Sequence, residues 1–163
     1  MLLVLVALVS CVTSRQRVQG DYVTVYYEGL AAYERGDYVA AMVIFKQLAL
    51  EGDALSQLYV GSMYERGEGV ATNIREAIRW YQSSAAQGNV DAQMNLAEIY
   101  SAGDLVAQDL VQTCLWWMLA AEQGESSAVN SLASLRMQMT TEQILEAERL
   151  ADQLREQITK ARH

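Results

Sequence analysis

The chain has 163 residues, of which 52% are hydrophobic and 20% charged, and its net charge is −8. This composition supports a buried core and excludes a disordered tail, and the acidic balance disfavours nucleic acid because phosphate backbones would be repelled. Proline is absent while alanine, leucine, glutamine and glutamate are frequent, so the sequence favours helix.

The first ten residues differ in kind from the rest. The apolar run Leu2 to Val9 is too short to span a bilayer, which needs about 20 apolar residues, but it matches the core of a signal peptide. It ends in Leu8-Val9-Ser10-Cys11, which resembles the lipobox of bacterial lipoproteins, although no basic residue precedes the run. The resemblance implies a signal peptide at 1–10, a lipidated Cys11 and a linker at 11–20.

The same resemblance implies a location on the periplasmic side of the outer membrane, with the lipid as the only membrane contact. Two alternatives stay open for this segment. Without lipid the protein would be periplasmic or secreted, and the apolar run could instead be an ordinary N-terminal helix with Cys11 buried.

Residues 21–137 repeat at a spacing of 36. The glycines Gly52, Gly88 and Gly124 keep this spacing, and so do the aromatic residues Phe45, Tyr81 and Trp117. Such a period indicates a repeat architecture. We expect units at about 21–52, 53–88, 89–124 and, as a partial unit, 125–137.

Each unit is predicted to be a pair of helices. Gly67 and Gly103 follow the last apolar residue of a helix and suit the left-handed conformation that ends it. Asn73 and Asp109 are predicted to cap the second helices. Because one unit cannot cover both of its apolar faces, the units must stack into an all-α solenoid, with Gly88 and Gly124 closing helices and Tyr81 and Trp117 packed between them.

The segments "SQLYVGSMYERGEGVATNIREAIRWYQSSAAQG" and "AQMNLAEIYSAGDLVAQDLVQTCLWWMLAAEQG" resemble Sel1-like repeats. The resemblance implies TPR-like helical hairpins of about 36 residues. Two positions depart from the pattern: Leu105 replaces a loop glycine, and Asn73 replaces an acidic residue.

The last segment, 138–163, leaves the repeat and is predicted to be a capping helix. Thr140 and Gln143 have the spacing of a capping box, and apolar residues then recur at helical spacing from Ile144 to Ile158. Such a helix would shield the open end of a solenoid. A binding site for a partner helix is the alternative.

No catalytic constellation is found. The only histidine is His163, so no histidine base or histidine-based metal site can form, and Cys114 occupies a position that is apolar in the other units. The tryptophans could stack on a sugar, but their repeat register favours packing. We expect no enzyme activity, no metal and no cofactor.

The hypothesis is a non-enzymatic scaffold of the bacterial cell envelope that binds a protein partner on its concave face. The candidate groove residues share one register on the first helices: Glu28, Tyr59, Asn95 and Ser131. The alternatives are a periplasmic module that binds envelope polysaccharide or peptidoglycan, and a soluble adaptor without lipid.

Overall fold

The structure is a computed structural model that describes residues 22–161. The predicted signal peptide, the lipidation site Cys11 and the linker lie outside the described residues. Within residues 22–161 the regular elements are all helices. None of the helices searched in that range combines the length and the hydropathy that a membrane span needs.

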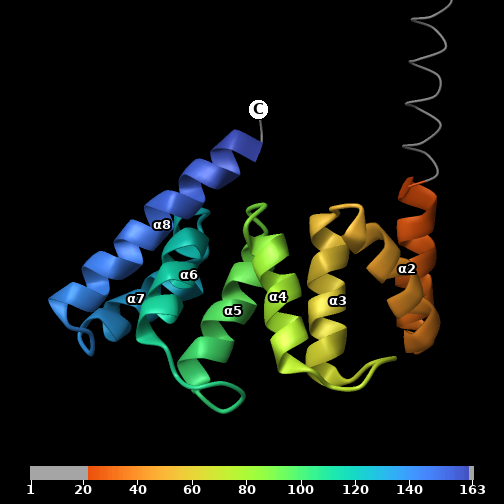
Figure 1. Ribbon diagram of the computed structural model, residues 1–163, viewed down its shortest axis with the longest axis horizontal. Helices are drawn as coiled ribbons and strands as arrows, with labels where there is room; N and C mark the ends of the chain where they lie inside the picture. The colour runs from red at the N-terminus through yellow and green to blue at the C-terminus, as the bar shows by residue number, and fades with distance from the viewer. Residues whose placement is uncertain (1–21, 162–163) are drawn as a thin grey trace, which may run out of the picture.

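The helices form a row of antiparallel hairpins (Figure 1). A first helix covers residues 22–34. It is followed by α2 (Tyr38–Leu50), α3 (Ala54–Arg66), α4 (Ile74–Ala85), α5 (Val90–Ala102), α6 (Leu110–Glu122), α7 (Ser126–Arg136) and α8 (Thr141–Ala161). Consecutive helices from α2 to α7 pack on one another and α8 packs on α6, so the predicted all-α solenoid is confirmed.

Short polar side chains begin the helices, as the sequence predicts. The Asn73 side chain accepts a hydrogen bond from Glu76 N at the start of α4, and Asp109 accepts from Val111 N and Gln112 N at the start of α6. Asp53 and Asn89 cap α3 and α5 in the same way. These bonds satisfy backbone donors that a helix start would otherwise leave free.

The predicted structural glycines have positive φ angles, with values of 74° for Gly67, 88° for Gly88, 74° for Gly103 and 94° for Gly124. Gly67 and Gly103 are the left-handed C-caps of α3 and α5. A residue with a Cβ adopts this conformation only at an energetic cost, so glycine is the residue that lets the chain leave the helix here.

The loops after α3 and α5 close alike but differ at Leu105. Asn73 N donates to Tyr64 O at 2.8 Å, and Asp109 N donates to Tyr100 O at 3.0 Å. Gly69 has a φ of 70° and lies so close to Tyr38 O that an added Cβ would be 2.2 Å from it. Leu105, at the equivalent position, is exposed and has no positive φ, since no described non-glycine residue does.

Aromatic side chains hold the hairpins together. Tyr81 on α4 is 1% exposed, and a Cβ added to Gly61 on α3 would lie 2.7 Å from its ring. The missing side chain at Gly61 therefore makes room for the Tyr81 ring. Trp116 is also buried, whereas Trp117 is half-buried, so the prediction that these residues pack between helices holds fully for Tyr81 and partly for Trp117.

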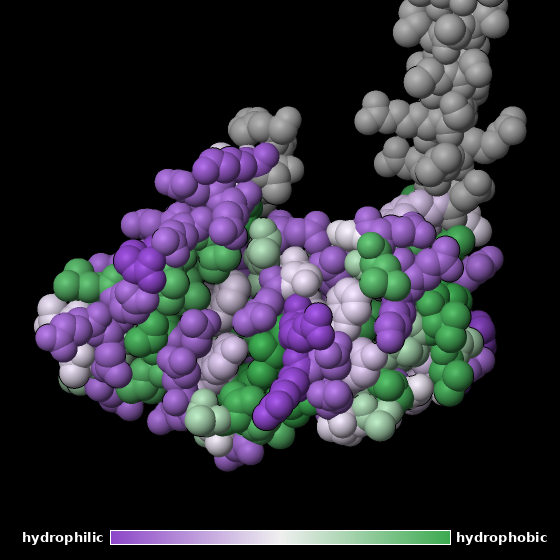
Figure 2. All heavy atoms as spheres, viewed as in Figure 1, coloured by the Kyte–Doolittle hydropathy of each residue, from purple (hydrophilic) through white to green (hydrophobic). Residues whose placement is uncertain are grey.

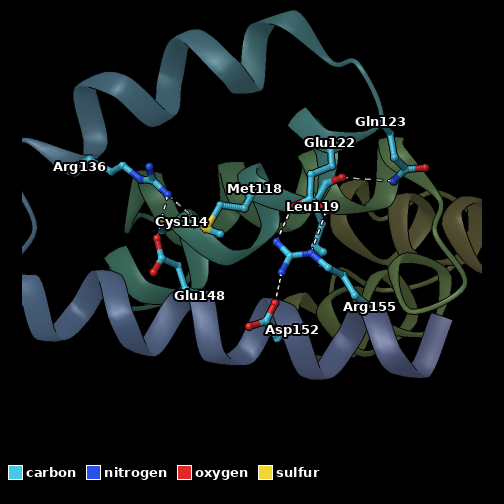
Figure 3. Close-up of polar contacts among 9 residues, drawn as sticks. All are labelled: Cys114, Met118, Leu119, Glu122, Gln123, Arg136, Glu148, Asp152 and Arg155. Carbon is cyan, nitrogen blue, oxygen red and sulfur yellow. Dashed lines mark hydrogen bonds and ion pairs between the residues drawn. The ribbon is translucent and has the colours of Figure 1, made fainter. Parts of the chain in front are cut away.

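The C-terminal helix α8 begins with the predicted capping box. Gln143 N donates to Thr140 Oγ1 at 3.2 Å, and Thr140 N donates to Gln143 Oε1 at 2.9 Å. The helix packs on α6 and buries Ala147 and Ala151. Figure 3 shows two of the polar links: Arg136 of α7 pairs with Glu148 of α8, and Arg155 of α8 pairs with Glu122 of α6.

Candidate functional site

Two hollows lie between consecutive first helices, and each contains one predicted groove residue. The acidic hollow, of about 180 Å³, is lined by Asn95 together with Glu65 of α3, Glu98 of α5 and Asp104 of the following loop. Three carboxylates around one amide make this surface suited to a cationic group. One of them, Glu65, also accepts a hydrogen bond from the Tyr81 hydroxyl at 2.6 Å.

The polar hollow, of about 410 Å³, contains Ser131. Its lining includes Ser101 of α5, Trp117 of α6 and, on α7 and just after it, Asn130, Ser134 and Gln138. Amide and hydroxyl groups of this kind both donate and accept hydrogen bonds, so this hollow can bind a neutral polar group such as a peptide backbone. Trp117 adds an apolar face to it.

The other two predicted groove residues lie outside these hollows. Glu28 is exposed on the first helix. Tyr59 is half-buried, and its ring stacks on Phe45 with ring centroids 4.5 Å apart and the planes 10° from parallel. Tyr59 therefore contributes to packing between the first units as well as to their surface.

This aromatic cluster also contains Tyr26 and Tyr33, whose rings lie against Tyr59 at centroid distances of 6.5 Å and 5.5 Å. Burial raises the pKa of Tyr26 to about 12, with a smaller contribution from Tyr59. The Tyr26 phenol is therefore neutral at physiological pH and acts as a packing group. The sequence register alone did not reveal this cluster, because it depends on how the first two units meet.

Two equivalent pairs of glutamines, here called the glutamine ladder, connect neighbouring helices, and the sequence-based reasoning missed them. Gln57 Nε2 donates to Ala49 O at 3.1 Å, and one repeat later Gln93 Nε2 donates to Ala85 O at 3.2 Å. Gln87 donates to Gln57 Oε1 at 2.8 Å, and Gln123 donates to Gln93 Oε1 at 2.9 Å. The 36-residue spacing of both pairs was the available signal.

The bonds from Gln57 to Ala49 O and from Gln93 to Ala85 O join each unit to the preceding one and are buried. Gln87 and Gln123, which bond Gln57 and Gln93 within a unit, are exposed. Buried amides need such partners, because an unpaired one is costly. The ladder thus ties the start of α3 to the end of α2 and the start of α5 to the end of α4.

The described residues contain no group of three or more acidic, cysteine or histidine side chains placed to hold a metal ion. Cys114 is buried in α6, and burial raises the pKa of its thiol, so it stays protonated and unreactive. The predicted role of Cys114 as a small apolar residue agrees with this placement.

The comparisons with known proteins agree with this architecture. The Sel1 repeat model matches residues 54–89 and 90–125, so the chain carries two Sel1 repeats. Repeats of this kind generally mediate contacts between proteins. A search of curated proteins returned no match.

Two solved structures have the same fold. One is a protective antigen of uropathogenic Escherichia coli strains with an SLR fold, at 24% identity and a TM-score of 0.74 over 91% of this chain. The other is a Sel1 repeat protein from Oxalobacter formigenes, at 29% identity and a TM-score of 0.61 over 68% of this chain. The chain spans only 34% and 47% of these two proteins, so the likeness concerns the fold.

Proposed function

We propose that this protein, whose chain carries two Sel1 repeats, is a non-enzymatic scaffold that is tethered in the bacterial cell envelope and holds a protein partner on its first-helix surface. The observation that supports the binding site most is the position of Asn95 and Ser131. These residues are one repeat apart and line hollows between consecutive first helices.

The chemistry of the hollows favours a particular kind of partner. The acidic hollow presents Glu65, Glu98 and Asp104, and the whole chain is acidic, so a partner segment with lysine or arginine would be attracted and oriented. The polar hollow next along the solenoid would bind the backbone of the same segment. A segment of this kind would lie across α5, with its basic side chain in the acidic hollow.

Site-specific photo-crosslinking in cells tests the site. A benzoylphenylalanine at position 95 should give a discrete adduct with one envelope protein, whereas the same residue at position 82, which is exposed on α4, should not. Glu98→Lys in the same chain should weaken that adduct, because it reverses a charge in the acidic hollow. Equal adducts from positions 95 and 82 would contradict the proposed site. An adduct at position 95 that Glu98→Lys leaves unchanged would contradict it as well.

The tether is proposed from the sequence resemblance at Leu8 to Cys11 and is tested separately. Palmitate labelling should mark the wild-type protein, and Cys11→Ala should leave it unlabelled and release it from membranes or block its processing. An unlabelled, full-length wild-type protein in the soluble fraction would refute the tether but not the binding site. In that case the scaffold would act without lipid.

A further inference from the structure

The outer faces of the second helices α2, α4 and α6 occupy equivalent positions, 36 residues apart. On α6 this face includes Leu115 and Leu119, each only 3% exposed. It is buried because α8 packs on α6, with Ala147 and Ala151 at the contact. An apolar outer face on a second helix is thus covered by another helix in this fold.

The outer face of α4 shows the opposite case. The residues equivalent to Leu115 and Leu119 are Arg79 and Ser83, and both are exposed. Arg75, one turn earlier, is exposed as well. Where the outer face meets water, the repeat therefore carries polar and charged residues, as expected for the solvated side of an amphipathic helix.

The outer face of α2 is apolar at Val43, which matches Leu115 of α6, and polar at Gln47, which matches Leu119, and both residues are exposed as on α4. Val39, Val43 and Leu50 are 65%, 66% and 72% exposed. Val39 and Val43 match Val111 and Leu115 of α6. Figure 2 shows hydrophobic side chains at the right-hand end of the molecule, where Figure 1 draws the first helix and α2. Among the described residues, none covers these three side chains as α8 covers Leu115 and Leu119.

We propose that the outer face of α2, formed by Val39, Val43 and Leu50, binds an amphipathic helix of a partner protein in the way that α8 binds α6. The apolar residues recur at spacings of four and seven, so they form a ridge that fits the groove of another helix. This surface lies on a second helix, whereas the hollows of the proposed function lie between first helices, so the two sites are independent.

The charges on this face select the partner. Lys46 lies between Val43 and Leu50 on the face, and its ammonium group bonds only Tyr64 Oη, at 3.1 Å, among the described residues. Two of its three hydrogens remain for a partner, which favours a helix with acidic side chains beside its apolar stripe.

A peptide with the sequence of residues 140–161 is a suitable probe, because α8 is the helix that covers the equivalent face and carries five acidic against three basic residues. Its binding to the chain from residue 20 onward is measured by fluorescence anisotropy. We expect saturable binding that Val43→Glu weakens about tenfold or more, as for a central apolar contact. Arg79→Glu, a matched change at the equivalent position of α4, should alter the affinity less than twofold.

Circular dichroism should show that Val43→Glu is folded, since Val43 is exposed. Absence of peptide binding at millimolar concentration would overturn the proposal. Binding that Val43→Glu leaves unchanged would also overturn it, because the peptide would then be exchanging with the chain's own α8. Sedimentation that reveals self-association sensitive to Val43→Glu would assign the face to a second copy instead and refute a partner helix.

Discussion

Replacing Tyr81 tests the packing of the α3–α4 hairpin. Tyr81 is almost fully buried, its ring fills the space left by Gly61, and its hydroxyl donates to Glu65 Oε2 at 2.6 Å. Tyr81→Ala would leave a cavity between the two helices. We expect a loss of about 3–5 kcal/mol in the free energy of unfolding, the usual cost of truncating a buried aromatic side chain.

A second variant separates the ring from the hydroxyl. Tyr81→Phe keeps the ring and removes only the hydrogen bond to Glu65, which is partly exposed and can be solvated instead. We expect this change to cost about 1 kcal/mol. Most of the effect of Tyr81→Ala should therefore come from the cavity.

Urea denaturation and thermal unfolding, both followed by far-ultraviolet circular dichroism, measure both variants. Tyr81→Ala should lower the melting temperature by about 10 °C, and Asn95→Ala, in the acidic hollow, should leave it nearly unchanged. Hydrogen exchange should show the lost protection first in α3 and α4, because a solenoid is stabilised by contacts between neighbours. If Tyr81→Phe costs as much as Tyr81→Ala, or if Asn95→Ala melts the protein, the assignment of the packed and open faces is wrong.

Three further predictions follow from other contacts. Burial and the hydrogen bond to Glu65 raise the pKa of Tyr81 above its usual value near 10. The stabilisation that Tyr81 contributes to the folded state is therefore fully present below pH 10 and is lost as the pH rises above 10. Denaturation at pH 9 to 11 should show a smaller alkaline loss for Tyr81→Phe than for the wild type, and equal losses would contradict this. Gly61→Ala should lower the free energy of unfolding, measured in urea, by about 1–3 kcal/mol, because the added Cβ would clash with the Tyr81 ring. This loss should outweigh the higher helix propensity of alanine, and a stabilised variant would show that the hairpin can relax. Gln93→Leu should cost about 1 kcal/mol by removing its hydrogen bonds to Ala85 O and Gln123, since Ala85 O keeps its bond from Gly88 N and Gln123 is exposed. Adding Gln123→Leu should add little, and an equal further loss would contradict the pairing of these two side chains.

Local features of the helices followed directly from residue type and spacing. The caps at Asn73 and Asp109, the left-handed glycines Gly67 and Gly103 and the capping box at Thr140 are all present. Each depends on contacts within a few residues of the chain, so the residues involved predict it without knowledge of the rest of the fold.

The candidate groove was predicted only in part. Asn95 and Ser131 do line hollows, but Tyr59, in the same register, stacks on Phe45. The register placed all three on first helices. It could not show that the first two units carry extra aromatic rings that fill the space between them.

The sequence by itself therefore determined the repeat, the helices and their ends, because a 36-residue period and the caps are written in neighbouring residues. The tertiary structure alone decided which equivalent faces are covered. Leu115 of α6 is buried because α8 packs on it, whereas Val43, at the same position of α2, is exposed. The physical reason is that burial depends on which distant helix arrives at a face, and a residue's own spacing does not contain that information.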